Sequence, residues 1–154
     1  TCYLLLVTAT KELFMTNQAP PPMPRPVPIA DEASQPFFDA AAAGKLLLRF
    51  CPKCQRFMTY SAEFCDNCLG AGLEWRPASG KGTIYSFVIM HQVLHPGFAG
   101  EVPYNVIVVE TDEGPRLQSN LLGTADAGIK VGMRVEVQCE RAGDVMVPYW
   151  KAAS

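Results

Sequence analysis

The sequence lacks an excess of charge of either sign, and this limits the functions open to it. Its 154 residues include 13 lysine or arginine and 15 aspartate or glutamate side chains, for a formal net charge of −2. Because these charges are interspersed, the chain has no general attraction to the phosphate backbone that dominates nucleic-acid affinity. The apolar run 2–7 is too short to cross a bilayer and has no basic residue before it. We therefore expect a soluble, cytoplasmic protein.

Recognisable catalytic motifs are also missing. The sequence has no nucleophile elbow, phosphate-binding loop or paired-carboxylate motif. Its only two histidines, His91 and His95, flank a loop after a predicted strand. No acidic residue at motif spacing is present to orient either ring, so two solvent-facing loop histidines are the simpler interpretation, and a loop that lines a site is the alternative. We assign no catalytic residue and expect no activity from the chain alone.

The cysteines are few and unevenly spaced. Of six in all, Cys2 and Cys139 stand alone, and the other four form two tight pairs, Cys51 with Cys54 and Cys65 with Cys68. Two such pairs are typical of a metal site and not of a secreted disulfide framework. Four thiolates suit one structural zinc ion, since a closed tetrahedral shell leaves no open position for substrate. Iron is the minority alternative, because a similar knuckle binds iron in rubredoxins, and four reduced core cysteines are the remaining one.

Composition divides the chain into four segments. Residues 1–30 are expected to be an extension and a proline-rich mobile arm, with a short helix or strand over 4–14 as an alternative. Residues 31–47 predict a docking helix, because capping oxygens and Pro36 precede a helix-prone run that contains Phe37 and Phe38. A lone helix of this length is unstable in water, so it should pack on the core or on a partner. Residues 48–72 predict the zinc ribbon.

The remaining segment, 73–154, predicts a small β-barrel. Strand signals separated by turn residues recur over 83–93, 102–111, 116–122, 134–139 and 145–150. Five short strands with no helix to cover an open sheet favour a closed Greek-key barrel, the OB-fold. The predicted fold class is therefore mainly β: a short N-terminal helix, a rubredoxin-like zinc ribbon and a five-stranded OB-fold barrel.

The order of these elements resembles a known family. After the helix that ends near Gly44 come the sequences CPKC and CDNC, then GKGTIYS at 80–86, Val102-Pro103-Tyr104 and Asp112-Glu113-Gly114. This order is similar to that of the acyl-CoA-associated zinc-ribbon plus OB-fold family, also called domain of unknown function 35. The likeness runs from about Pro36 to Trp150.

The resemblance implies an accessory subunit without catalytic machinery of its own. Such subunits dock on thiolase-fold enzymes that act on acyl-CoA thioesters, in thiolase, synthase or retro-aldolase complexes, including those of steroid side-chain degradation. A hetero-oligomer with a shared acyl-CoA site is therefore expected. The residues that we assign to partner or acyl-CoA contact are Phe37, Phe38, His91, His95, Phe98 and Tyr104.

A single-stranded nucleic-acid-binding ribbon and OB module is the alternative function. An OB-fold that reads single strands needs a basic groove with stacking aromatic side chains. Residues 71–154 hold seven lysine or arginine against nine aspartate or glutamate side chains, which disfavours this alternative. An apolar fraction of 49% in a small chain instead favours an extensive apolar interface with a partner protein.

Overall fold

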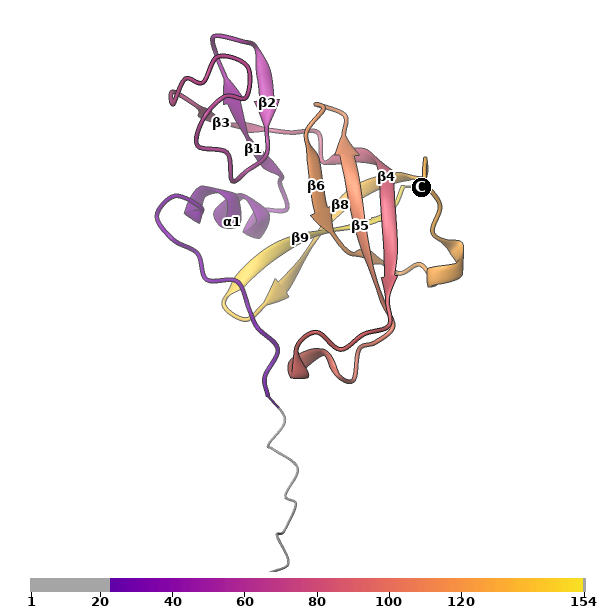
Figure 1. The fold of residues 1–154 in the computed structure, drawn as a ribbon. Helices are drawn as coiled ribbons and strands as arrows, with labels where there is room; N and C mark the ends of the chain where they lie inside the picture. The colour runs from indigo at the N-terminus through magenta and orange to yellow at the C-terminus, as the bar shows by residue number, and fades with distance from the viewer. Residues whose placement is uncertain (1–22, 154) are drawn as a thin grey trace, which may run out of the picture.

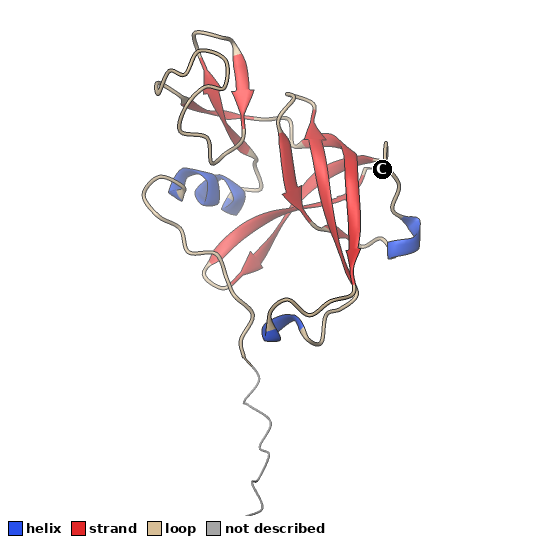
Figure 2. Cartoon of the chain, in the orientation of Figure 1, coloured by secondary structure: helices blue, strands red, loops and turns tan. Residues whose placement is uncertain are grey.

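The computed structural model describes residues 23–153, which form two β-sheets and one α-helix (Figures 1 and 2). The predicted extension and the first part of the proline-rich arm lie outside these residues. The strands are β1 (Leu47–Cys51), β2 (Arg56–Met58), β3 (Glu74–Pro77), β4 (Lys81–Met90), β5 (Tyr104–Thr111), β6 (Arg116–Ser119), β7 (Leu121–Leu122), β8 (Arg134–Ala142) and β9 (Val145–Ala152). The helices are α1 (Gln35–Ala42) and two 3₁₀ turns, η1 (Pro96–Phe98) and η2 (Asp126–Gly128). Among the described residues, no helix has the length and apolarity needed to cross a membrane.

The smaller sheet has the order β2-β1-β3 and is antiparallel throughout. It includes Leu47 and the strand Glu74–Pro77, which lie on either side of the range 48–72 assigned from the sequence. Its hairpin joins β1 to β2 around the first cysteine pair. We call this unit, residues 47–77, the four-cysteine ribbon.

The larger sheet has the order β6-β5-β4-β8-β9-β7 and curls into a barrel. Its two edge strands, β6 and β7, are consecutive in the chain and are separated only by Asn120. The segment 116–122, predicted as one strand, therefore pairs with β5 through its first half and, in parallel, with β9 through its second half. The predicted fold class, mainly β with an OB-fold domain, is confirmed. The sheet has six strands where five were predicted, because the segment 116–122 divides in two, and its edge strands do not pair with each other to close the barrel.

Side chains complete the barrel where this strand changes partner. Asn105 is 9% exposed, accepts a hydrogen bond from the Leu121 amide at 2.7 Å and donates one to the Leu121 carbonyl at 3.0 Å. Asn120 donates to the Asn105 carbonyl, and its own carbonyl accepts from the Trp150 amide at 3.1 Å. These bonds satisfy backbone groups that the interrupted ladder would otherwise leave buried and unpaired.

Helix α1 packs against β9 and β1 between the ribbon and the barrel. Pro36 lies in its first turn, and Gly44, at φ 70°, follows its end. The Lys45 amide then donates to the Ala40 carbonyl at 2.9 Å, which closes the helix terminus. The main core joins the helix to the barrel and consists of Phe37, Leu46, Leu48, Ile84, Ile107, Val109, Leu117, Leu121, Ile129, Val135 and Trp150.

Candidate metal centre and contact surface

Four cysteine side chains meet in the ribbon. The Sγ atoms of Cys51, Cys54, Cys65 and Cys68 all lie within 4.8 Å of one another, and those of Cys51 and Cys68 are 3.8 Å apart. A tetrahedral ion with metal–sulfur bonds of about 2.3 Å would hold its sulfurs about 3.8 Å apart. Cys51 and Cys65 are buried, and the other two are half-buried. The donor set therefore fits one metal ion in a closed shell of thiolates.

The two cysteine pairs sit on turns of the same kind. In each, the residue after the second cysteine adopts a left-handed conformation: Gln55 at φ 52° and Leu69 at φ 55°. Gln55 Nε2 donates to the Pro52 carbonyl at 2.6 Å, and the Leu69 amide donates to the Cys65 carbonyl at 2.9 Å. Non-glycine residues adopt this conformation rarely, so each turn carries strain that its surroundings must hold in place.

The thiols differ in acidity. Hydrogen bonds from the backbone amides of Cys68 and Asn67 lower the pKa of Cys65 to about 7. The Asn67 side-chain amide donates to Cys54 Sγ at 3.3 Å and lowers the pKa of that thiol, but the neighbouring thiols and burial outweigh it and raise the pKa to about 11. Because a metal ion takes thiolates as ligands, its binding here would release protons.

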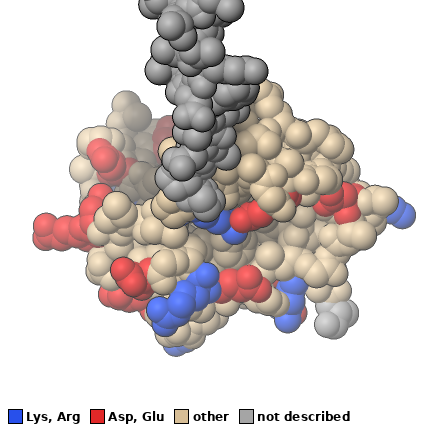
Figure 3. All heavy atoms as spheres, turned by 90° about the horizontal axis from the view of Figure 1, so that it is seen from below, with Lys and Arg blue, Asp and Glu red and all other residues tan. Residues whose placement is uncertain are grey.

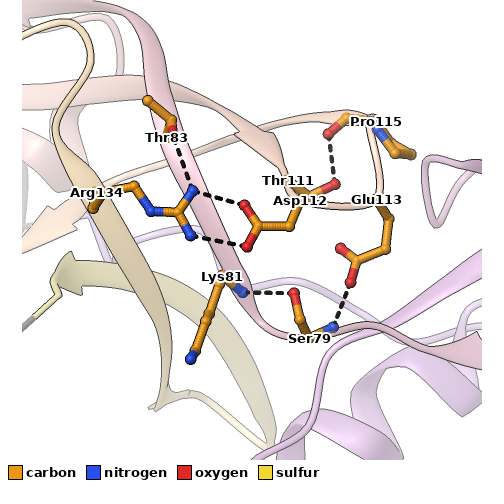
Figure 4. A network of polar contacts seen from close by, with 8 residues as sticks. All are labelled: Ser79, Lys81, Thr83, Thr111, Asp112, Glu113, Pro115 and Arg134. Carbon is orange, nitrogen blue, oxygen red and sulfur yellow. Dashed lines mark hydrogen bonds and ion pairs between the residues drawn. The ribbon is translucent and has the colours of Figure 1, made fainter.

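A polar network holds the link between the ribbon and β4 (Figure 4). The Ser79 amide donates to Glu113 Oε1 at 2.6 Å, which ties the linker to the β5–β6 turn. Arg134 donates to both carboxylate oxygens of Asp112, at 2.7 and 2.8 Å, and to Thr83 Oγ1 at 3.1 Å. The Arg134 hydrogen bonds are the largest cause of the lowered pKa of Asp112. The network fixes where the ribbon leaves the barrel.

Three of the predicted contact residues come together near η1. The ring centroids of His95 and Phe98 are 6.2 Å apart, and those of Phe98 and Tyr104 are 5.7 Å apart. The Arg25 guanidinium lies 4.9 Å from the Phe98 centroid and pairs with Glu101 at 3.2 Å. The described part of the arm is therefore packed against this loop.

A groove of about 750 Å³ opens beside these rings. The arm at 25–28, the outer side of β5 and β6, and the β8–β9 turn surround it. OB-folds commonly bind extended ligands on this face. Its charged lining is balanced, with Arg25 and Arg141 against Glu101 and Glu140, and the view from below shows acidic and basic side chains interspersed (Figure 3). The groove is not the basic channel that single-stranded nucleic acid requires.

The other predicted contact residues lie elsewhere. Phe37 is 6% exposed and its ring stacks on Tyr60 with centroids 4.2 Å apart. Phe37 therefore packs into the chain's own core, on the side of α1 that faces the barrel. It offers no exposed surface to a partner. Phe38 is half-buried against the same core. His91 is exposed just beyond the end of β4, which stops at Met90 and not at Val93 as predicted.

Neither histidine is arranged for acid–base chemistry. His95 Nδ1 accepts a hydrogen bond from the Gly97 amide at 3.0 Å and caps η1. Within residues 23–153, no carboxylate forms an ion pair with His91 or His95. The described residues thus present a four-cysteine cluster, a groove and an aromatic loop.

Sequence reasoning missed the contribution of the arm. A side chain at Gly97 would come within 2.8 Å of the Arg25 backbone, so the arm passes directly over this residue. The link between Arg25 and Glu101 spans more than seventy positions of sequence, and no local pattern predicts it. Proline at every second position over 24–28 was the available signal, and it indicated an arm without showing what the arm contacts.

Comparison with known proteins shows which family has this architecture of a four-cysteine ribbon followed by an OB-fold barrel. Residues 75–140 match the family model described as ChsH2, C-terminal OB-fold domain. A solved structure of the "Ltp2-ChsH2(DUF35) aldolase" is similar over 82% of this chain and 99% of that chain, with a TM-score of 0.71 and 30% sequence identity. The chain belongs to the DUF35 family.

Two curated relatives extend this result. The chain is 31% identical over 150 residues to the "Probable enoyl-CoA hydratase alpha subunit" of Thermomonospora curvata. This match covers 97% of this chain and 46% of that protein. It is 28% identical over 92 residues to the "DUF35 domain-containing scaffold protein" of Methanocaldococcus jannaschii. This second match covers 59% of this chain and 64% of that protein. The chain thus spans about half to two thirds of the length of these relatives.

Proposed function

We propose that this chain is a non-catalytic subunit that docks on a thiolase-fold enzyme and helps to form its CoA-thioester site. The observation that carries the proposal is the match to the DUF35 chain of the Ltp2-ChsH2 aldolase, which extends over 99% of that chain at 30% identity. The name of that aldolase pairs a DUF35 chain with a second component, Ltp2. The likeness includes nearly all of that chain, and so includes whatever surface it uses to assemble.

The described side chains support a binding role. Acyl transfer or aldol cleavage needs a nucleophile or base together with a stabiliser of the developing oxyanion. His95 is occupied as a cap of η1, and His91 stands alone on an exposed loop. The chemistry would therefore come from the partner, while this chain contributes the surface around His95, Phe98 and Tyr104.

The metal that we propose for the four thiolates is zinc, in a structural role. All four ligands would come from the protein, so no position would remain for a substrate or a reactive water. Iron in the same shell is the alternative. Metal analysis of freshly purified, reduced protein decides between them, with about one equivalent of zinc expected for each chain; less than half an equivalent of either metal would defeat the assignment.

A hydratase complex is the second candidate setting. It is favoured by the match to the Thermomonospora hydratase subunit, which extends over 97% of this chain. The match covers only 46% of that protein, so the hydratase activity itself is not carried over to this chain. Here too, the chain would serve an enzyme that acts on a CoA thioester.

Complex formation tests the proposal. The full chain is mixed with a purified Ltp2-type subunit, which we take as the candidate thiolase-fold partner, and, separately, with a hydratase subunit that lacks its own DUF35 segment. Size-exclusion chromatography with light scattering then measures mass and stoichiometry. We expect a stable complex of fixed composition with the thiolase-fold subunit. Binding only to the hydratase subunit would favour the second candidate, and a monodisperse chain that binds neither would contradict both.

A further inference from the structure

The middle of strand β5, residues 106–109, is apolar on both faces. Along Tyr104–Thr111 its side chains alternate between half-buried and buried positions, as expected for a strand on the barrel wall. The inward residues include Ile107 and Val109, but Val106 and Val108 on the outward side are apolar too. An antiparallel sheet with one solvated face normally places polar residues outward, and an apolar sequence on both faces is typical of a strand covered on both.

The neighbouring strand continues this surface. In the β4–β5 register, Met90 lies opposite Tyr104, Val88 opposite Val106 and Ser86 opposite Val108. We call these six residues the uncharged face: Ser86, Val88, Met90, Tyr104, Val106 and Val108. Val88, near its centre, is 54% exposed. Strands β6, β5 and β4 lie side by side in Figure 1, and no helix of the described chain covers their outer side there.

The six residues of this face carry no charge, and the Arg116–Glu110 pair at 3.2 Å borders it, with the Arg116 guanidinium 3.4 Å from the Tyr85 ring centroid. Between Lys81 and Glu110 the only charged side chain in the sequence is Glu101, and Arg25 pairs with it at 3.2 Å. The loop that joins the two strands adds Val93, 43% exposed, and Leu94, 66% exposed. Depletion of charge with enrichment in aromatic residues and methionine distinguishes the centre of a protein interface from the rest of a surface.

The groove indicates what kind of occupant this face has. Tyr104 and Val106 belong both to the uncharged face and to the lining of the 750 Å³ groove, so the two surfaces are continuous. A second copy related by a twofold axis would set the same surface against itself, and paired hollows would face each other across the axis. A different chain with an uncharged surface and a projecting segment would fill both surfaces.

We propose that the uncharged face and the adjoining groove are the surface on which the partner enzyme subunit docks. This inference rests on the proposed function and specifies the surface through which it acts. The partner's complementary surface is apolar and uncharged, because a charge brought against this face would lose its water, while the Arg25–Glu101 and Arg116–Glu110 pairs at its borders are already neutralised. The groove receives a segment that projects from that surface.

Substitution of one exposed valine tests the proposal, and another exposed valine supplies the control. Val88→Asp places a carboxylate at the centre of the uncharged face, where the free chain leaves it solvated. Val131→Asp makes the same change at a residue that is 63% exposed and lies beside Thr83 and Asp112, at the other end of β4. Affinity for the Ltp2-type subunit is measured by calorimetry, with metal content and unfolding midpoint as checks on folding. We expect Val88→Asp to weaken binding at least about 10-fold and Val131→Asp to change it less than about 2-fold.

Val88→Lys is a second test variant that controls for a folding defect specific to Val88→Asp. It should weaken binding by a similar factor. Folded Val88 variants that bind as tightly as the unmodified chain would overturn the docking surface while leaving the proposed function intact. A homodimer that both Val88 variants dissociate would show that the occupant is a second copy, which also overturns the inference. If the unmodified chain itself does not bind, the proposed function fails instead.

Discussion

The ribbon and the barrel are stabilised in different ways. The buried residues of the ribbon's own cluster are Cys51, Met58 and Cys65, so two of the three are candidate metal ligands. The larger cluster of eleven buried residues lies mainly in the barrel and the helix, where Trp150 is 1% exposed, and it includes only Leu48 from the ribbon. Three short strands with so little apolar interior cannot offset the conformational entropy of folding without a metal. The barrel has a core large enough to stand without one.

Because the two units are stabilised differently, the polar network that ties the linker at Ser79 to the barrel is important for holding the ribbon in place. The ribbon and the barrel share few backbone ladders, and they meet mainly through the linker, the turn after β5 and helix α1. Loss of the metal should therefore disorder the ribbon while the barrel keeps its fold. Four changes test this division, in order of decreasing expected effect.

The largest effect is expected from Cys65→Ser. The change removes a thiolate ligand, and a lost ligand should cost more than the 10–100-fold that a lost supporting contact costs, so we expect zinc affinity to fall by about 100-fold or more. Hydrogen exchange should then show loss of protection in the ribbon at 47–77 and retained protection in β4, β5 and β8. The matched control is Cys139→Ser, a half-buried cysteine on β8 outside the cluster. Equal loss of protection in both units would show that they fold as one.

Trp150→Ala tests the other unit. The side chain is almost fully buried in the barrel core, and truncation of such a residue typically costs about 3–5 kcal/mol. Denaturant unfolding should show this loss while the folded protein keeps its metal. Tyr85→Ala, at an exposed aromatic residue on β4, serves as the control. A variant that lost its metal at low denaturant would indicate that the ribbon depends on the barrel core.

Asn105→Leu tests how the barrel is completed. It leaves the Leu121 amide and carbonyl without their side-chain partners, at a cost of about 2 kcal/mol or more. The same unfolding measurement applies, with Gln118→Leu on the exposed side of β6 as the control. If both variants have the same stability, the Asn105 bonds do not hold the seam.

The smallest effect concerns pH. The pKa of Asp112 is lowered from its ordinary 3.8 by Arg134, so the ion pair stabilises the fold above that value and is lost as the pH falls through the lower, folded-state pKa. Asp112→Asn should flatten the fall in unfolding midpoint as the pH drops below the ordinary value of 3.8. The effect should be slight, since both side chains are exposed. The Asp144→Asn variant should retain the original slope, and a steep change in it instead would contradict the assignment.

The ribbon could be predicted from the sequence because its signal is local. Two cysteines three positions apart must share a turn, and two such turns suffice for the cluster observed. Strand β3 was missed because Glu74-Trp75-Arg76-Pro77 has no alternating pattern, and it joins the sheet only by pairing with β1. The break at Asn120 was missed for a similar reason: it depends on Asn105, which is remote in sequence.

Contact residues were harder to predict than metal ligands. The pattern around Phe37 correctly indicated a helix but could not show which of its faces would meet the core. The grouping of His95, Phe98 and Tyr104 depends on the path of a loop and on Arg25 from the arm. The uncharged face was visible only after the register of β4 and β5 had shown which residues point outward.

Turnover of a CoA thioester tests the central proposal most directly. Activity is measured with this chain alone, with the thiolase-fold subunit alone and with the two mixed at equal concentration. The account predicts no turnover by this chain, little by the enzyme subunit and full activity in the mixture. Robust turnover by this chain alone, abolished by His91→Ala, would show that the chain is an enzyme in its own right and would contradict the account.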